Sequence, residues 1–107
     1  NNNNNNNNKN NSALTYPDSI WVDYNQTYHQ VRFTWNAVQN AQNYGIAVYL
    51  AGRWRIQTQS ISSSTTTYTT PKNMTPGMTY KVAIAAKVNG SWDVANAIKH
   101  AVTITVQ

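Results

Sequence analysis

The chain has 107 residues, enough for one domain but not for two. Hydrophobic residues make up 40% of it and charged residues only 10%, against a usual ~25%, and the formal net charge is +5. With no cysteine and no apolar run near the ~20 residues of a membrane span, the composition excludes a disulfide framework, a thiolate metal site, a cysteine nucleophile and membrane insertion.

The N-terminal segment, residues 1–11, consists of ten asparagines and Lys9. Such a tract has nothing to bury and cannot offset the entropy lost on ordering. We expect a flexible linker that joins a further module of a longer protein, followed by one domain over residues 12–107. No signal peptide is recognisable, so we expect a mature fragment or an excised module.

From residue 12 onward, apolar and polar residues alternate with a period of two, as in half-buried strands. Turn signals separate the runs, and the strongest is Asn89-Gly90, because both residues tolerate the positive φ of a type I′ hairpin. The spacing predicts an all-β, seven-stranded antiparallel sandwich without a helix. The expected strands are residues 20–24, 31–35, 44–50, 53–56, 65–69, 80–88 and 102–106.

Two segments together resemble the fibronectin type III family. Residues 31–35 end in Trp35, like the family's second strand, and Tyr44 begins the next strand after a loop of small residues. Residues 74–80 read Met-Thr-Pro-Gly-Met-Thr-Tyr, similar to the family's Leu-x-Pro-Gly-x-x-Tyr turn. The likeness covers about residues 16–106, including a sixth strand that leads into the Asn89-Gly90 hairpin.

The resemblance implies an immunoglobulin-like sandwich from a secreted bacterial multi-modular protein. It also implies that Trp35 is a core residue, and that Tyr80 is a buried corner tyrosine whose hydroxyl bonds to backbone near Met74 or Thr75. Met74 stands where the family usually has leucine. Residues 92–101 form a longer run than usual before the last strand, so the path of this segment stays open.

Catalysis and metal binding lack the residues they need. The acids are Asp18, Asp23 and Asp93, which are scattered, and the histidines are His29 and His100. A glycosidase needs two carboxylates across a cleft, and a nucleophilic enzyme needs a base oriented by an acid. We therefore expect no enzyme, no metal and no cofactor.

Basic residues do not gather into a stripe, as nucleic-acid binders require. Apart from Arg53 and Arg55, which flank Trp54, they stand singly, and we expect no nucleic-acid partner. Glycosylation sequons begin at four asparagines and matter only in a chain secreted through an endoplasmic reticulum: Asn10, Asn25, Asn73 and Asn89.

The tryptophans are the candidate binding residues. Trp54 and Trp92 each follow a turn, while Trp21 has the opposite parity to Ile20 and Val22, which predicts partial exposure. A sugar ring stacks its apolar face on an aromatic side chain, and guanidinium groups bond its hydroxyls. The predicted carbohydrate-contact residues are Trp92, Trp54, Arg53, Arg55 and Tyr49. The alternative is that Trp54 lies flat over its own sheet and Trp92 closes one end of the sandwich.

Three functions remain open at this point. The first is a spacer or accessory module of a secreted or cell-surface protein, with weak polysaccharide contact and neighbouring modules as partners. The second is a dedicated carbohydrate-binding module of a polysaccharide-degrading system. The third is a protein-binding adhesion module that pairs through a sheet edge or loops. In each case we expect an extracellular monomer.

Overall fold

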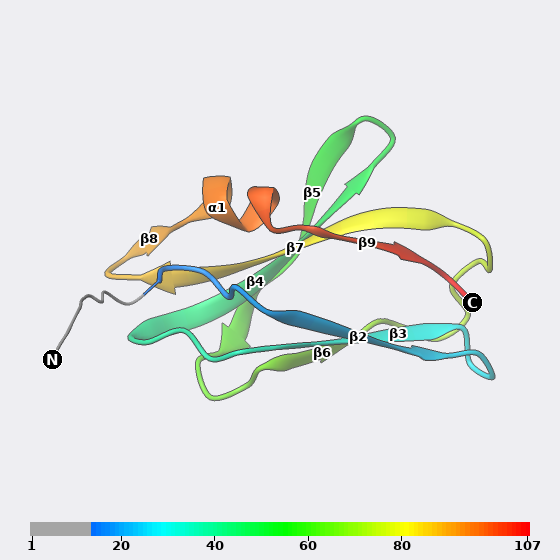
Figure 1. Cartoon of the computed structure of the whole chain (residues 1–107), viewed down its shortest axis with the longest axis horizontal. Helices are drawn as coiled ribbons and strands as arrows, with labels where there is room; N and C mark the ends of the chain where they lie inside the picture. The colour runs from blue at the N-terminus through cyan, green and yellow to red at the C-terminus, as the bar shows by residue number, and fades with distance from the viewer. Residues whose placement is uncertain (1–13) are drawn as a thin grey trace, which may run out of the picture.

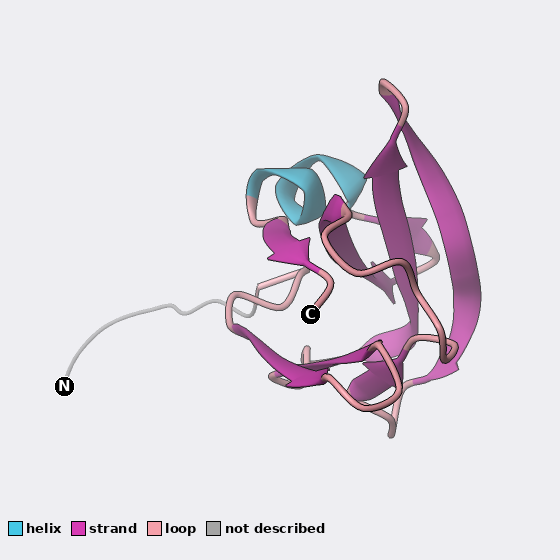
Figure 2. Cartoon of the chain, turned by 90° about the vertical axis from the view of Figure 1, so that its right-hand side faces the viewer, coloured by secondary structure: helices cyan, strands magenta, loops and turns pink. Residues whose placement is uncertain are grey.

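The computed structural model describes residues 14–107, which form two antiparallel β-sheets packed face to face (Figures 1 and 2). The predicted linker, residues 1–11, lies outside the described residues. The smaller sheet has the order β2-β3-β6, and the larger has the order β5-β4-β7-β8, with β9 also paired to β7. The strands are β2 (Ile20–Asn25), β3 (Gln30–Trp35), β4 (Ala41–Leu50), β5 (Arg53–Ser62), β6 (Thr67–Thr69), β7 (Thr79–Val88), β8 (Ser91–Trp92) and β9 (Val102–Thr105). The predicted all-β sandwich is confirmed.

Alternating side chains of the two sheets make the core between them. In β3, Val31, Phe33 and Trp35 are buried, while Arg32 between them is exposed. Trp35 is 2% exposed and meets Tyr44 of the opposite sheet edge-on, with ring centroids 5.4 Å apart. The prediction that Trp35 belongs to the core is therefore correct, and its contact with Tyr44 ties the two sheets together.

The expectation of seven strands and no helix is wrong for residues 92–101. The described chain has eight strands and a six-residue helix, α1 (Val94–Lys99), between β8 and β9. β8 pairs with the end of β7 at Lys87, and β9 pairs with its beginning at Thr79. The last strand of the larger sheet is thus interrupted, and α1 contacts β7 in the interval (Figure 2).

Local signals explain why a helix forms there. The Asp93 side chain accepts a hydrogen bond from the backbone N–H of Asn96, which satisfies one of the free donors of the first turn. Ala97 buries its methyl group, and Lys99 places a positive charge in the last turn, where the helix dipole favours it. The helix has only about one and a half turns, which is too short to show the apolar periodicity that identifies longer helices in a sequence.

The Pro76-Gly77 turn is held by backbone hydrogen bonds. The Gly77 N–H donates to Val106 O at 2.8 Å, and the Val106 N–H donates to Met78 O at 2.9 Å. Tyr80 is half-buried and packs against the core, so the prediction of a buried Tyr80 is wrong. No hydrogen bond from its hydroxyl to residues 74–75 is found in the described part of the chain, where the Met74 N–H donates to His29 O and Thr75 O accepts from the Met78 N–H instead.

Two hairpins follow the expected turn chemistry. Asn89 and Gly90 both have positive φ, at 52° and 79°, and join β7 to β8, which confirms the predicted hairpin. Ala51 and Gly52 also have positive φ and join β4 to β5. Figure 1 shows this second hairpin projecting beyond the body of the sandwich.

Candidate binding surfaces on the two sheets

An apolar groove of about 330 Å³ lies on the outer face of the larger sheet. Its floor is made of small residues from two adjacent strands: Gly45, Ala47, Ala83 and Ala85. One wall comes from β5, with Trp54 and Ile56, and the other from β8 and α1, with Trp92 and Ile98. Outer faces of antiparallel sheets are usually polar, so this apolar strip is a distinct feature of the chain.

Trp92 is fixed against the floor of this groove. A Cβ atom at Gly45 would lie 3.2 Å from the Trp92 ring and 3.1 Å from the carbonyl oxygen of Thr58. Both distances are tighter than ordinary van der Waals contact, so only glycine fits without a shift of its neighbours. Position 45 thus allows the indole to rest directly on the sheet.

The structure brings together only part of the predicted sugar-contact set. Trp54 and Trp92 are half-buried and line the same groove, and Tyr49 meets Trp54 with ring centroids 5.4 Å apart. Neither of the two arginines is among the described residues that line the groove. Arg55 pairs with Val48, which packs on the core side of β4, and Arg53 shares that face because it lies two residues away.

The chemistry of this groove favours an apolar occupant. Trp54, Ile56, Trp92 and Ile98 offer almost no hydrogen-bond partner, and the backing by Arg53 and Arg55 expected from the sequence is missing. Buried sugar hydroxyls without partners would lose their hydrogen bonds to water, which costs free energy.

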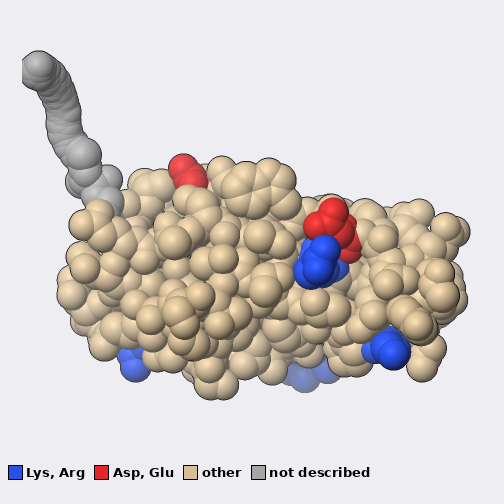
Figure 3. Space-filling view, turned by 90° about the horizontal axis from the view of Figure 1, so that it is seen from below, with Lys and Arg blue, Asp and Glu red and all other residues tan. Residues whose placement is uncertain are grey.

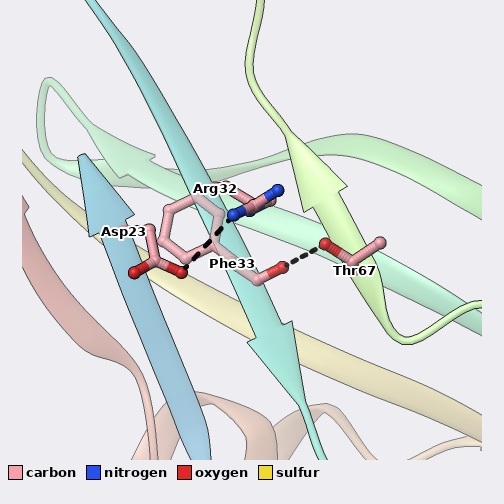
Figure 4. A network of polar contacts seen from close by, with 4 residues as sticks. All are labelled: Asp23, Arg32, Phe33 and Thr67. Carbon is pink, nitrogen blue, oxygen red and sulfur yellow. Dashed lines mark hydrogen bonds and ion pairs between the residues drawn. The ribbon is translucent and has the colours of Figure 1, made fainter. Parts of the chain in front are cut away.

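A second surface lies on the outer face of the smaller sheet. Trp21 is 56% exposed there, and its cross-strand partner is Thr34. Two residues further along β2, on the same face of the sheet, the carboxylate of Asp23 lies 4.0 Å from the guanidinium of Arg32 (Figure 4). A polar groove of about 420 Å³ surrounds this pair and is lined by Asp23, Tyr24, Asn25, Gln26, Gln30, Arg32 and Thr69.

Sequence reasoning did not assign a site to this second surface. The alternation of Trp21 with Ile20 and Val22 already indicated that its ring faces outward. The pairing of Asp23 with Arg32 could not be read from the sequence, because it depends on the register between β2 and β3.

Comparison with known proteins agrees with this architecture. The sequence matches no protein-family model and no curated protein. Among solved structures, it is similar to a Fn3-like protein from Clostridium thermocellum, with a TM-score of 0.61 and 23% sequence identity. The alignment covers 76% of this chain and 83% of that one. The chain has a fibronectin type III-like fold. The resemblance identified from residues 31–35 and 74–80 is therefore confirmed at the level of the fold.

Charge on the Fn3-like sandwich is sparse. Figure 3, which views it from below Figure 1, shows a few charged side chains, among them one acidic and one basic side chain next to each other, on an otherwise uncharged surface. Within residues 14–107, no group of three or more metal-ligating side chains is close enough to hold an ion. No helix in this part of the chain is long and apolar enough to cross a membrane.

Proposed function

We propose that the chain is a non-catalytic accessory module that holds neighbouring modules of a secreted or cell-surface protein apart, with weak polysaccharide contact as a second role. The observation that carries the spacer role is the position of the two ends of the described chain. The domain measures 50 × 26 × 25 Å, and residue 14 and Gln107 lie toward opposite ends of its long axis (Figure 1).

Contacts at both ends support this role. At the N-terminal end, the Thr15 hydroxyl donates to the carboxylate of Asp93, and the Tyr16 ring lies 4.6 Å from the ring of His100. These contacts connect the incoming chain to the two ends of α1. A segment held at two points transmits its orientation to whatever precedes it.

The C-terminal end is also fixed to the body. Val106 is 2% exposed and exchanges backbone hydrogen bonds with the Pro76-Gly77 turn. The carbonyl oxygen of Gln107 lies 2.8 Å from Nδ1 of His29. The last two residues are thus held against the domain by contacts, which supports a fixed orientation of the chain at this end.

The roles of the ionisable residues support a non-catalytic module. Asp18 accepts a hydrogen bond from the Asn36 amide at 2.8 Å, and Asp93 caps α1. Nδ1 of His100 contacts the backbone carbonyl oxygen of Asn96, and Nδ1 of His29 contacts the backbone oxygen of Gln107. A general base of the usual kind is oriented by an acidic side chain, and neither contact is of that kind.

The spacer role is tested by measuring the distribution of distances between spin labels at the two ends of the domain. The chain has no cysteine, so Leu14→Cys and Gln107→Cys place two spin labels uniquely while reporter domains are fused to both ends. We expect one narrow distance close to the long axis of the domain. Asp93→Ala, which removes the Thr15 contact, should broaden it and serves as the control. A broad distribution in the unmodified background would contradict the spacer role.

The polysaccharide role is tested separately by sedimentation with a panel of insoluble polysaccharides. One stacked ring supports only millimolar binding, about −4 kcal/mol, so retention requires a dense polymer or several copies of the module. If the protein stays in the supernatant with every polymer, the polysaccharide role is wrong, and the spacer role is unaffected.

A further inference from the structure

We propose that the polysaccharide contact is made by the outer face of the β2-β3-β6 sheet, and that its ligand is a neutral sugar chain. Trp21 is the stacking platform, and the Asp23–Arg32 pair supplies the hydroxyl partners. This inference rests on the polysaccharide role proposed above and moves it away from the groove of Trp54 and Trp92.

The exposure of Trp21 is the first argument. Its side chain is 56% exposed, whereas Trp35 is 2% exposed and Trp54 and Trp92 are half-buried. The residues beside Trp21 on the neighbouring strands are Thr34 and then Thr67, whose side chains are much shorter than an indole. The indole is therefore not walled in by its cross-strand neighbours, and its apolar surface is free to stack on a sugar ring.

The second argument is the free hydrogen-bonding capacity of the adjacent pair. Asp23 and Arg32 meet only at 4.0 Å, and their side chains are 65% and 59% exposed. A guanidinium carries five N–H donors, and a carboxylate accepts through two oxygens, so most of this capacity is unused. In Figure 4 both side chains project from the sheet, beside the bond from the Thr67 hydroxyl to Phe33 O.

The surrounding groove adds amides to this pair. Gln30 uses its Nε2 to donate to Thr70 O, and Asn25 uses its Oδ1 to accept from the Tyr28 N–H. The remaining atoms of these amides, together with the exposed Gln26, line the same groove as Asp23 and Arg32. Trp21 does not line this groove, so the amides continue the polar surface on the far side of the Asp23–Arg32 row from the indole, where a neighbouring sugar would find donors and acceptors.

The spacing of the two rows suits a polymer. Two residues along a strand span about 7 Å, so the Asp23–Arg32 row lies about that far from the Trp21 row. A chain lying across the face can stack one sugar on Trp21 while the hydroxyls of the same or the next sugar reach the ion pair. Because these contacts lie in successive rows of the sheet, an extended polymer can reach more of them than a small free sugar.

Charge selects a neutral ligand. The two ionised groups at the site have opposite signs, and few other charged side chains appear on the face shown in Figure 3. An anionic polymer would be attracted by Arg32 but repelled by Asp23 beside it. A neutral sugar gains hydrogen bonds from both groups.

The indole N–H signals of the four tryptophans provide the test, because nuclear magnetic resonance resolves weak binding residue by residue. Isotope-labelled full-length protein is titrated with soluble cello-oligosaccharides and, in separate arms, with xylo-oligosaccharides and oligogalacturonate. Trp21→Phe assigns the Trp21 signal. We expect this signal to move with a neutral ligand at millimolar concentration, while the Trp54 and Trp92 signals stay in place.

Variants identify the groups that carry the binding. Trp21→Ala should weaken it about tenfold or more, the effect of losing a stacked aromatic. Arg32→Gln and Asp23→Asn should each weaken it several-fold. Trp54→Ala is the matched control and should leave the affinity unchanged. Because Trp21 is exposed, the thermal midpoint of the Trp21→Ala variant should stay close to that of the wild type. Weaker binding by this variant would then not be caused by unfolding.

Three results would overturn the inference. If the Trp54 and Trp92 signals move and Trp21 does not, the contact lies in the apolar groove and the wider polysaccharide role survives. If only oligogalacturonate binds, and added salt abolishes it, the neutral ligand is wrong. If no oligosaccharide and no insoluble polymer binds, both this site and the polysaccharide role are wrong, while the distance measurement still decides the spacer role.

Discussion

The hydroxyl of Tyr44 accepts a hydrogen bond of 2.8 Å from the backbone N–H of Val38, in the buried interior of the domain. Tyr44 is 0% exposed, and its ring also meets Trp35 edge-on. One side chain thus joins β4, the end of β3 and the connection between them. The resemblance predicted that the hydroxyl of Tyr80 would fix a loop by a hydrogen bond to the backbone. In the structure, the hydroxyl of Tyr44 makes such a bond, to the loop between β3 and β4.

Tyr44→Phe should lower the free energy of unfolding by about 1–3 kcal/mol, because it leaves the buried Val38 N–H without its partner. Tyr80→Phe is the matched control and should cost less than about 1 kcal/mol, since Tyr80 is half-buried and water can replace any lost contact. Urea denaturation of both variants measures the difference. Equal losses, or a larger loss for Tyr80→Phe, would show that the wrong tyrosine has been chosen.

Gly45→Ala should destabilise the fold by about 1–3 kcal/mol, the usual cost of forcing an extra methyl group into a packed site. The new Cβ would meet both the Trp92 ring and the Thr58 carbonyl oxygen. The measurement is a double-mutant cycle with Trp92→Ala. Relative to Trp92→Ala alone, the added Gly45→Ala should cost less than it does in the wild type. Simple additivity of the two losses would mean that the indole does not rest on this glycine.

Asp93 should make stability depend on pH in the acid range. Hydrogen bonds from Thr15 and then from Asn96, with the nearby charge of Lys99, hold the pKa of this carboxyl below its ordinary value. The folded state therefore binds the proton less tightly than the unfolded state, where the pKa is about 3.9. The stabilisation is fully present above that pH and is lost as the pH falls through the lower pKa of the folded state.

The check is the unfolding free energy of the wild type and of Asp93→Asn measured from neutral to strongly acid pH. The wild type should be the more stable at neutral pH, and the gap should close on acidification. A gap that stays constant with pH would show that the charge of Asp93 contributes nothing to stability.

Deleting residues 1–11 should leave the thermal midpoint of the domain unchanged. These residues lie outside the described part of the chain, and the expectation follows from their composition, which offers no apolar side chain to bury. Thermal unfolding of the full and shortened chains, followed by far-ultraviolet circular dichroism, provides the comparison. A drop of several degrees would mean that the asparagine tract packs on the domain.

The local sequence was sufficient for the sheet class and the main turns. Alternation with a period of two identified β3 and β7, and the pair Asn89-Gly90 identified the hairpin after β7. Each of these signals acts between near neighbours, since strand alternation and turn conformation depend on a few successive residues. The same local parity correctly placed Trp35 in the core and indicated that Trp21 faces outward.

Only the tertiary structure decided which side chains share a surface. The pairing of β4 with β5 contains register shifts between Tyr44 and Ala47, and such irregularities change which residues face each other without leaving a clear sequence signal. The grouping of Arg53 and Arg55 with Trp54 was an error of a different kind: it followed nearness in the chain, although the alternation within β5 already puts the arginines on the other face. Trp92 reaches the same groove as Trp54 because α1 interrupts the last strand and Gly45 leaves room for the indole. Exposure and grouping depend on contacts between residues far apart in the chain, and those contacts form only when both sheets have folded.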